Sequence, residues 1–91
     1  MRLSRRVTII NKLGLHARAA AKLVATASRF ASEIQLRRDN GTEVNAKSIL
    51  GVMMLAAAKG VELEISAEGE DAVEALDAVE DLIQRRFDEG E

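Results

Sequence analysis

The 91-residue chain contains no cysteine and a single histidine, His16. The absence of cysteine excludes disulfide bonds and thiolate metal sites, and one imidazole cannot form the cluster of ligands that zinc needs. We therefore expect the protein to bind neither a metal ion nor any other cofactor.

Tryptophan and tyrosine are absent too, and the two phenylalanines, Phe30 and Phe87, lie outside the strands predicted below. RNA-binding sheets stack bases on aromatic side chains of their strands, so this scarcity argues against a nucleic-acid module. The longest nearly apolar run, residues 49–58, is too short to span a bilayer. Residues 7–10, which follow the N-terminal arginines, are too few for the apolar core of a signal peptide. We expect a cytoplasmic protein that binds neither nucleic acid nor membrane.

The charges are unevenly distributed along the chain, although the net charge is only −2. Residues 1–38 carry nine Lys or Arg and one acidic residue, whereas residues 39–91 carry four bases and fourteen acids. A basic first half is typical of a protein with an anionic ligand or partner. The alternative is that the two halves of one small domain neutralise each other, and the charge pattern alone does not separate these interpretations.

The spacing of apolar residues predicts the element order β-α-β-β-α-β-α within one domain that covers residues 1–91. Strands are expected over residues 3–10, 33–38, 42–46 and 61–67, and helices over residues 17–28, 49–58 and 71–87. One apolar face per strand predicts an open-faced α/β sandwich of the α+β class. It would have a four-stranded, mainly antiparallel sheet and three helices on one face. Ferredoxin-like folds share the β-α-β-β-α-β core, so the order alone does not identify the fold.

His16 lies where the first helix should begin, with either Leu15 or His16 in the cap position. The first backbone N–H groups of a helix lack helical partners, and the helix dipole adds partial positive charge, so such a terminus can bind an anion. His16 brings a nucleophilic nitrogen, Arg18 brings a guanidinium that matches phosphate oxygens, and Gly14 permits a tight chain entry. The segment therefore fits a phosphoryl acceptor. The alternative is that His16 is a simple cap or surface residue and Arg18 a solvated side chain.

The rest of the sequence does not resemble a self-contained kinase. It has no glycine-rich phosphate loop and no obvious pair of carboxylates for magnesium near His16. We expect a carrier with a transient phosphohistidine, whose chemistry partner proteins complete, rather than a free-standing enzyme. A small-ligand regulatory domain or a plain interaction module is the alternative, and it leaves His16 without a role.

The helix predicted over residues 49–58 is apolar on all sides, a pattern typical of a helix that is either buried or partly exposed to a partner. One sheet and three helices cannot cover every side of it. Some of its apolar residues should therefore face outwards as a partner-docking surface, and the candidates are Leu50, Met53, Met54 and Ala57. The alternative places the two methionines in the core. Ser48 precedes this helix and suits its N-cap position.

Three segments closely resemble HPr, the family of phosphocarrier proteins of the phosphoenolpyruvate-dependent phosphotransferase system. GLHARAA resembles the active-site segment of that family, NAKSILGVM its regulatory serine segment, and ISAEGEDA its last strand and turn. The resemblance implies an HPr-like fold and a phosphoryl group received from Enzyme I on the δ1 nitrogen of His16. Arg18 would bind the phosphoryl oxygens, and the group would pass on to a histidine of an EIIA-type protein. Ser48 matches the serine that HPr kinase/phosphorylase modifies where that enzyme exists, and Lys22 and Lys47 become basic neighbours of the docking surface.

Ala19 departs from the family pattern, which usually has proline directly after the arginine. Proline fits a first helical turn because its missing N–H is spare and its φ is preset, so alanine should give a slightly less rigid helix start with acceptor function retained. The stretches NKLGLHAR, RRDNGTE and MMLAAAKG and the RFDEGE end look more like the nitrogen-related branch, NPr, than the sugar branch. That branch feeds a regulatory EIIA protein. We expect a monomer.

Overall fold

The computed structural model describes residues 1–90, which contain one four-stranded sheet in the order β1-β4-β2-β3. The strands are β1 (Arg2–Thr8), β2 (Glu33–Arg38), β3 (Glu43–Asn45) and β4 (Glu62–Glu68). Every neighbouring pair is antiparallel, and Leu36 lies opposite Val44 on one side and Ile65 on the other. The predicted antiparallel sheet is therefore confirmed.

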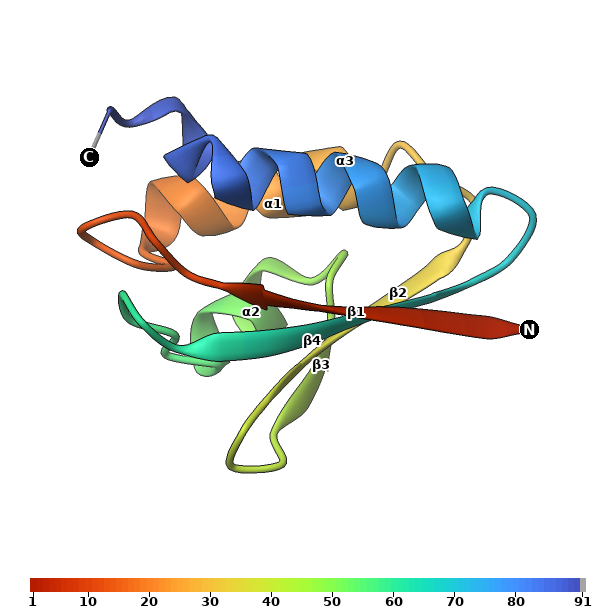
Figure 1. Cartoon of the computed structure of the whole chain (residues 1–91), viewed down its shortest axis with the longest axis horizontal. Coiled ribbons are helices and arrows are strands. Elements are labelled where there is room, and N and C mark those ends of the chain that lie inside the picture. The colour runs from red at the N-terminus through yellow and green to blue at the C-terminus, as the bar shows by residue number, and fades with distance from the viewer. Residues whose placement is uncertain (91) are drawn as a thin grey trace.

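Three helices complete the fold: α1 (Ala17–Ala27), α2 (Ile49–Met54) and α3 (Ala72–Gln84). A single turn of 3-10 helix, η1 (Arg86–Asp88), follows α3. Helices α1 and α3 contact each other and form a layer over the sheet, while α2 contacts β3 and α1 (Figure 1). The element order and the open-faced sandwich agree with the predictions. No helix within residues 1–90 is long and apolar enough to cross a membrane.

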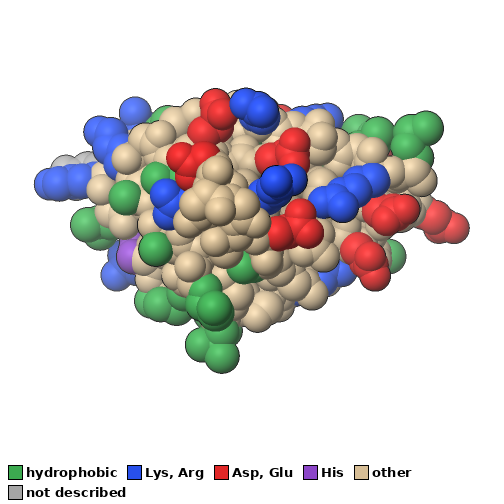
Figure 2. Space-filling model, turned by 90° about the horizontal axis from the view of Figure 1, so that it is seen from below, with side chains coloured by type: hydrophobic (Ala, Val, Ile, Leu, Met, Phe, Trp, Pro, Cys, Tyr) green, Lys and Arg blue, Asp and Glu red, His purple; other side chains and the backbone are tan. Residues whose placement is uncertain are grey.

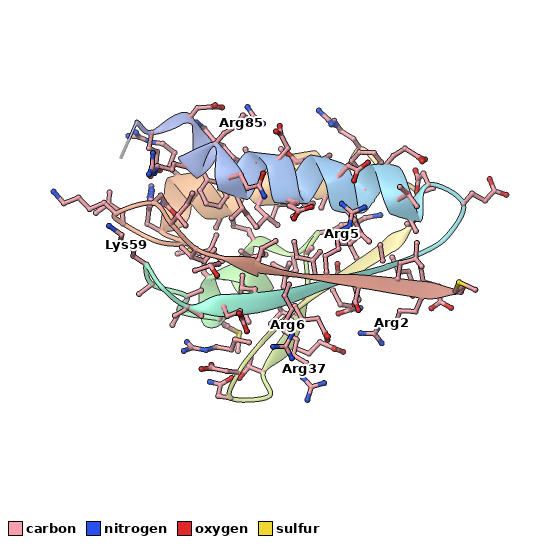
Figure 3. The ribbon with its side chains drawn as sticks, in the orientation of Figure 1. Arg2, Arg5, Arg6, Arg37, Lys59 and Arg85 are labelled. Carbon is pink, nitrogen blue, oxygen red and sulfur yellow. The ribbon has the colours of Figure 1, made fainter. Side chains whose placement is uncertain are left out.

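The core fills the space between the sheet and the helices, and the strand alternation explains its composition. Alternate residues of β2 and β4 point inward, so Ile34, Leu36, Leu63 and Ile65 are all at most 1% exposed. The small side chains Ala19, Ala20 and Ala27 of α1 are fully buried and let this helix pack closely. The other face of the sheet is open: Figure 3 places Arg6 and Arg37 there, and Figure 2 shows side chains of both charges across it.

Ion pairs across the sheet and onto α3 support the neutralisation interpretation of the uneven charge. Arg2 pairs with Glu43 at 3.2 Å and Arg6 with Glu62 at 3.1 Å. The guanidinium of Arg5 contacts the carboxylates of two α3 residues, Asp77 and Glu80. These arginines of the basic first half therefore meet acids of the second half.

The prediction of a helix over residues 49–58 is wrong at its C-terminal end. Helix α2 ends at Met54, Ala56 has a φ of +51°, and Ala57 is only 2% exposed rather than part of an outer surface. The chain leaves the helix because the carbonyl of Ala57 accepts a hydrogen bond from the N–H of Leu15 at 2.9 Å. Gly14 packs against the same carbonyl, and a Cβ there would lie 2.5 Å from it.

The helix predicted over residues 71–87 also ends early, at Gln84. Its expected apolar stripe is buried, but Phe87 reaches the core through a left-handed turn: Arg86, Phe87 and Asp88 have φ values of 56°, 54° and 63°. The turn folds the C-terminal segment back toward the start of α1. The other predicted element ends either coincide with the observed ends or differ from them by one or two residues.

Candidate functional site

His16 is the N-cap of α1, which decides between the two cap positions that the sequence allowed. Its backbone is extended (φ −70°, ψ 177°), and its carbonyl accepts the first helical hydrogen bond, from Ala20 at 2.8 Å. Its Nδ1 accepts a hydrogen bond from the backbone N–H of Arg18 at 3.3 Å. Because an acceptor nitrogen carries a lone pair, Nδ1 is unprotonated and directed toward the helix start.

The other ring nitrogen of His16, Nε2, contacts the carboxylate of Glu89. The second oxygen of that carboxylate, Oε1, accepts a hydrogen bond from Nδ2 of Asn11 at 3.0 Å, and the same Nδ2 donates to the carbonyl of Gly14 at 2.8 Å. One ring nitrogen thus faces a donor and the other an acceptor. We assign the neutral tautomer with its proton on Nε2 from these neighbours.

Burial and neighbouring groups shift the pKa of Glu89 in opposite directions. Burial raises its pKa, but the hydrogen bonds from Asn11 and His16 and the positive charge of Arg18 outweigh this, so the pKa lies below the usual range. The side chain of Glu89 is 11% exposed, whereas that of His16 is 27% exposed. The carboxylate is therefore ionised at neutral pH while the imidazole remains accessible to a partner.

The surroundings of His16 form an open hollow at one end of the molecule. Figure 2 shows the histidine there, beside hydrophobic and basic side chains. The hollow is lined by Lys12, Leu13, His16, Ala17, Arg18 and Glu89. Arg18 is exposed in the first turn of α1, and Ala19, fully buried, is the third helical residue, so its backbone N–H adds a donor that proline would remove.

The start of α2 contains the other residues that the sequence singled out. Ser48 is its N-cap, and Oγ accepts a hydrogen bond from the N–H of Gly51 at 3.1 Å. Three of the four predicted docking residues are exposed: Leu50 by 73%, Met53 by 43% and Met54 by 74%. The contact between Leu15 and the segment after α2 brings this apolar surface close to His16.

Both predicted basic neighbours are anchored to backbone carbonyls. The Nζ of Lys22 donates to Phe87 at 2.7 Å, and the Nζ of Lys47 donates to Phe30 at 2.7 Å. Both side chains remain partly exposed, so their charges reach the surface. Lys22 also ties α1 to the C-terminal turn.

Asn11 and Glu89 are site residues that the sequence analysis missed. The only local signal for Asn11 was a polar residue directly after an apolar strand. No signal could identify Glu89, because it meets His16 only after the left-handed turn has reversed the chain.

An open-faced sandwich with a histidine at the N-terminus of its first helix defines a class of phosphocarrier domains. The family model "PTS HPr component phosphorylation site" matches residues 3–85, and the chain belongs to this HPr family, the phosphocarriers of the phosphotransferase system. It is 55% identical to the phosphocarrier protein HPr of Pseudomonas aeruginosa, over 93% of this chain and 94% of the relative.

Solved structures agree with this assignment. A structure of HPr-C-His from Thermoanaerobacter tengcongensis superposes with a TM-score of 0.91 at 48% identity, covering 96% of this chain and 97% of that one. A structure of an HPr dimer from the same organism has a TM-score of 0.75 at 49% identity and covers 89% and 92% of the two chains. Because a solved relative is dimeric, the monomeric state of this protein stays a prediction.

Proposed function

We propose that this protein accepts a phosphoryl group on Nδ1 of His16 from phospho-Enzyme I and passes it to a histidine of an EIIA-type protein. The observation that carries the proposal is the unprotonated Nδ1 at the start of α1, next to Arg18. A nucleophile in this position has its lone pair available without losing a proton first.

The transfer moves a phosphoryl group from nitrogen to nitrogen. The lone pair of Nδ1 forms the new N–P bond while the P–N bond of the donor breaks, and the donor nitrogen keeps that electron pair. The negative charge on the phosphoryl oxygens lies near the backbone N–H groups at the start of α1 and the guanidinium of Arg18. The second transfer reverses these bond changes with the acceptor histidine as nucleophile.

Labelling with phosphoenolpyruvate and Enzyme I tests the proposal. We expect one phosphate per chain, labile in acid, mapped to His16 and absent from His16→Ala. A Ser48→Ala variant is the matched control, because it removes a helix cap of the other candidate site but keeps the imidazole. A phosphate that survives acid, or that persists in His16→Ala, would refute the carrier function and favour a plain interaction module.

The partner-docking surface of the proposal is the exposed apolar part of α2, with Leu50, Met53 and Met54 at its centre. An apolar patch with flexible methionines suits a protein that meets both a donor and an acceptor. We expect Met54→Glu to weaken Enzyme I binding about tenfold or more, as for a central interface residue. Val73→Glu is the control, because Val73 is an exposed apolar residue of α3. Equal weakening by both variants would contradict this docking surface.

Three finer points complete the proposal. The exchange takes place in the cytoplasm, where phosphoenolpyruvate is made, and without a membrane or nucleic-acid partner. Regulatory phosphorylation falls on Ser48 where HPr kinase/phosphorylase is present. The resemblance of NKLGLHAR and RFDEGE to NPr supports an acceptor from the nitrogen-related branch, with a sugar-specific EIIA protein as the alternative. Parallel transfer assays with a nitrogen-related and a sugar-specific EIIA protein test that assignment, and faster transfer to the sugar-specific protein would contradict it.

A further inference from the structure

The C-terminal segment returns to His16 through a turn that L-amino acids rarely adopt. Arg86, Phe87 and Asp88 are three consecutive non-glycine residues with positive φ. Surrounding contacts have to enforce such a conformation. Two of them do so here: Phe87 is fully buried, and the Nζ of Lys22 donates to its carbonyl. The result of the turn is that Glu89 lies against His16.

Asn11 fixes the far side of the Glu89 carboxylate. Asn11 is fully buried near the beginning of the loop between β1 and α1, and its Nδ2 donates to the carbonyl of Gly14 and the carboxylate of Glu89. One amide group thus joins the loop before His16 to the C-terminal segment. Since Oε2 contacts Nε2 of the imidazole, Glu89 is held at both oxygens.

We propose that Glu89, held by Asn11, is a positioning residue that orients His16 for phosphoryl transfer. This inference rests on the proposed function of His16. Glu89 accepts a hydrogen bond from the Nε2–H group and so fixes both the ring orientation and the tautomer, as a carboxylate partner does for metal-bound and catalytic histidines. The Nδ1 lone pair then stays directed at the helix start, where the phosphoryl group arrives.

The same contact balances charge during transfer. When Nδ1 forms its bond to phosphorus, Nε2 keeps its proton, so the ring carries a positive charge until the group leaves. The carboxylate of Glu89 compensates this charge at the opposite edge of the ring from the phosphoryl group. When the acceptor takes the phosphoryl group, the electron pair of the N–P bond returns to Nδ1 and the ring becomes neutral again.

Proton NMR of the unphosphorylated protein tests the contact without any partner. At a pH of about 8.5, well above the ordinary pKa of histidine, we expect a downfield, slowly exchanging Nε2 proton in the unmodified chain. Glu89→Ala should lose this signal, and Glu89→Gln should shift it upfield. Asp88→Asn is the matched control: Asp88 belongs to the same turn but pairs with Arg85, and asparagine tolerates its left-handed backbone. An unchanged signal in Glu89→Ala would overturn the inference.

Phosphorylation rates with Enzyme I and phosphoenolpyruvate test the consequence. We expect Glu89→Ala to react about tenfold more slowly, at the lower end of the range for carboxylate partners of functional histidines. Glu89→Gln should be intermediate, and Asp88→Asn should match the unmodified chain. If the unmodified chain is labelled on His16 and both Glu89 variants react at its rate, the positioning role is wrong while the carrier function stands. If the unmodified chain is not labelled, the carrier function fails, and the positioning role fails with it.

Discussion

The side chains at the starts of α1 and α3 have different partners: His16 caps its own helix, whereas Asp71 binds the segment after α1. At the start of α1, one imidazole nitrogen accepts one backbone hydrogen bond at 3.3 Å, and the neighbouring groups face an open hollow. At the start of α3, the carboxylate of Asp71 accepts hydrogen bonds from the N–H groups of Ala31 and Ser32, both at 2.9 Å, and from the hydroxyl of Ser32. The carboxylate of Asp71 thus joins α3 to the segment after α1.

This difference between the two helix starts assigns fold stability to one of them and reactivity to the other. A histidine is a poor helix cap compared with Ser, Asp or Asn, and its single long hydrogen bond leaves the first N–H groups of α1 available to a ligand. The Asp71 carboxylate is already held by three hydrogen bonds within the protein. Fold stability should therefore depend on the α3 start, and transfer on the α1 start.

His16→Ala should have the largest effect on transfer, a complete loss of acid-labile phosphate, with little effect on the fold. His16→Ala removes the hydrogen bond from the Arg18 N–H and the contact with Glu89, which keeps Asn11 as a partner. We therefore expect the free energy of unfolding to fall by about 1–2 kcal/mol. Urea denaturation followed by circular dichroism measures this. A variant that loses several kcal/mol would mean that the α1 start is as structural as the α3 start.

Asp71→Asn should have the opposite effect to His16→Ala. Phosphoryl transfer should be normal, but the fold should be less stable at neutral pH, and its stability should depend less on acid. The hydrogen bond from the Ser32 hydroxyl, followed by that from the Ala31 N–H, lowers the pKa of Asp71 below its ordinary value. A carboxyl group with a lowered folded pKa contributes stability above its unfolded pKa, about 3.9, and loses it as the pH falls through the folded value. Melting temperatures of both chains between about pH 7 and pH 2 should converge at the acid end.

Glu70→Gln is the control for this experiment, because Glu70 is the exposed neighbour of Asp71. Melting curves of Asp71→Asn that stay parallel to those of the unmodified chain at every pH would show that the Asp71 carboxylate does not titrate with folding.

Arg18 should affect transfer less than His16, because it binds the phosphoryl oxygens without forming a bond to phosphorus. We expect Arg18→Ala to slow phosphorylation of His16 by roughly 10- to 100-fold, near the lower limit for the loss of a charge-stabilising donor. Arg18→Lys should recover part of the rate, since it keeps the charge but loses the planar fork. Arg37→Ala, on the open face of the sheet, is the control, and an equal rate in all three variants would make Arg18 a bystander.

Sequence periodicity predicted the parts of the fold that depend on local pattern. The alternation of Leu63 and Ile65 with acidic residues identified β4, and the stripe of apolar residues identified α3. The end of α2 was mispredicted because Ala57 leaves a good helical sequence to pair with Leu15, a tertiary contact. The same limit applies to the site: His16 and Arg18 are neighbours in sequence, whereas Glu89 arrives from the other end of the chain.

Ser48 lies at a third helix start, that of α2, and its substitution should have the smallest effect on stability and transfer. Its hydroxyl caps α2 by accepting one hydrogen bond from the N–H of Gly51, close to the exposed Leu50 and Met54. Aspartate is an equally good cap, and a negative charge is favourable at a helix N-terminus, so Ser48→Asp should leave stability equal or higher by about 0.3–1 kcal/mol.

The same aspartate should slow phosphorylation of His16 severalfold, because it places a negative charge beside the apolar docking surface and its basic neighbours, Lys22 and Lys47. Ser48→Ala should do the reverse, with a loss of about 1 kcal/mol from the missing cap and an unchanged transfer rate. The two variants should therefore rank in opposite order by melting temperature and by phosphorylation rate. If Ser48→Asp transfers at the normal rate, charge at the α2 start does not act through partner docking. The α2 start would then resemble the α3 start, because the side chain at each of them would serve the fold alone.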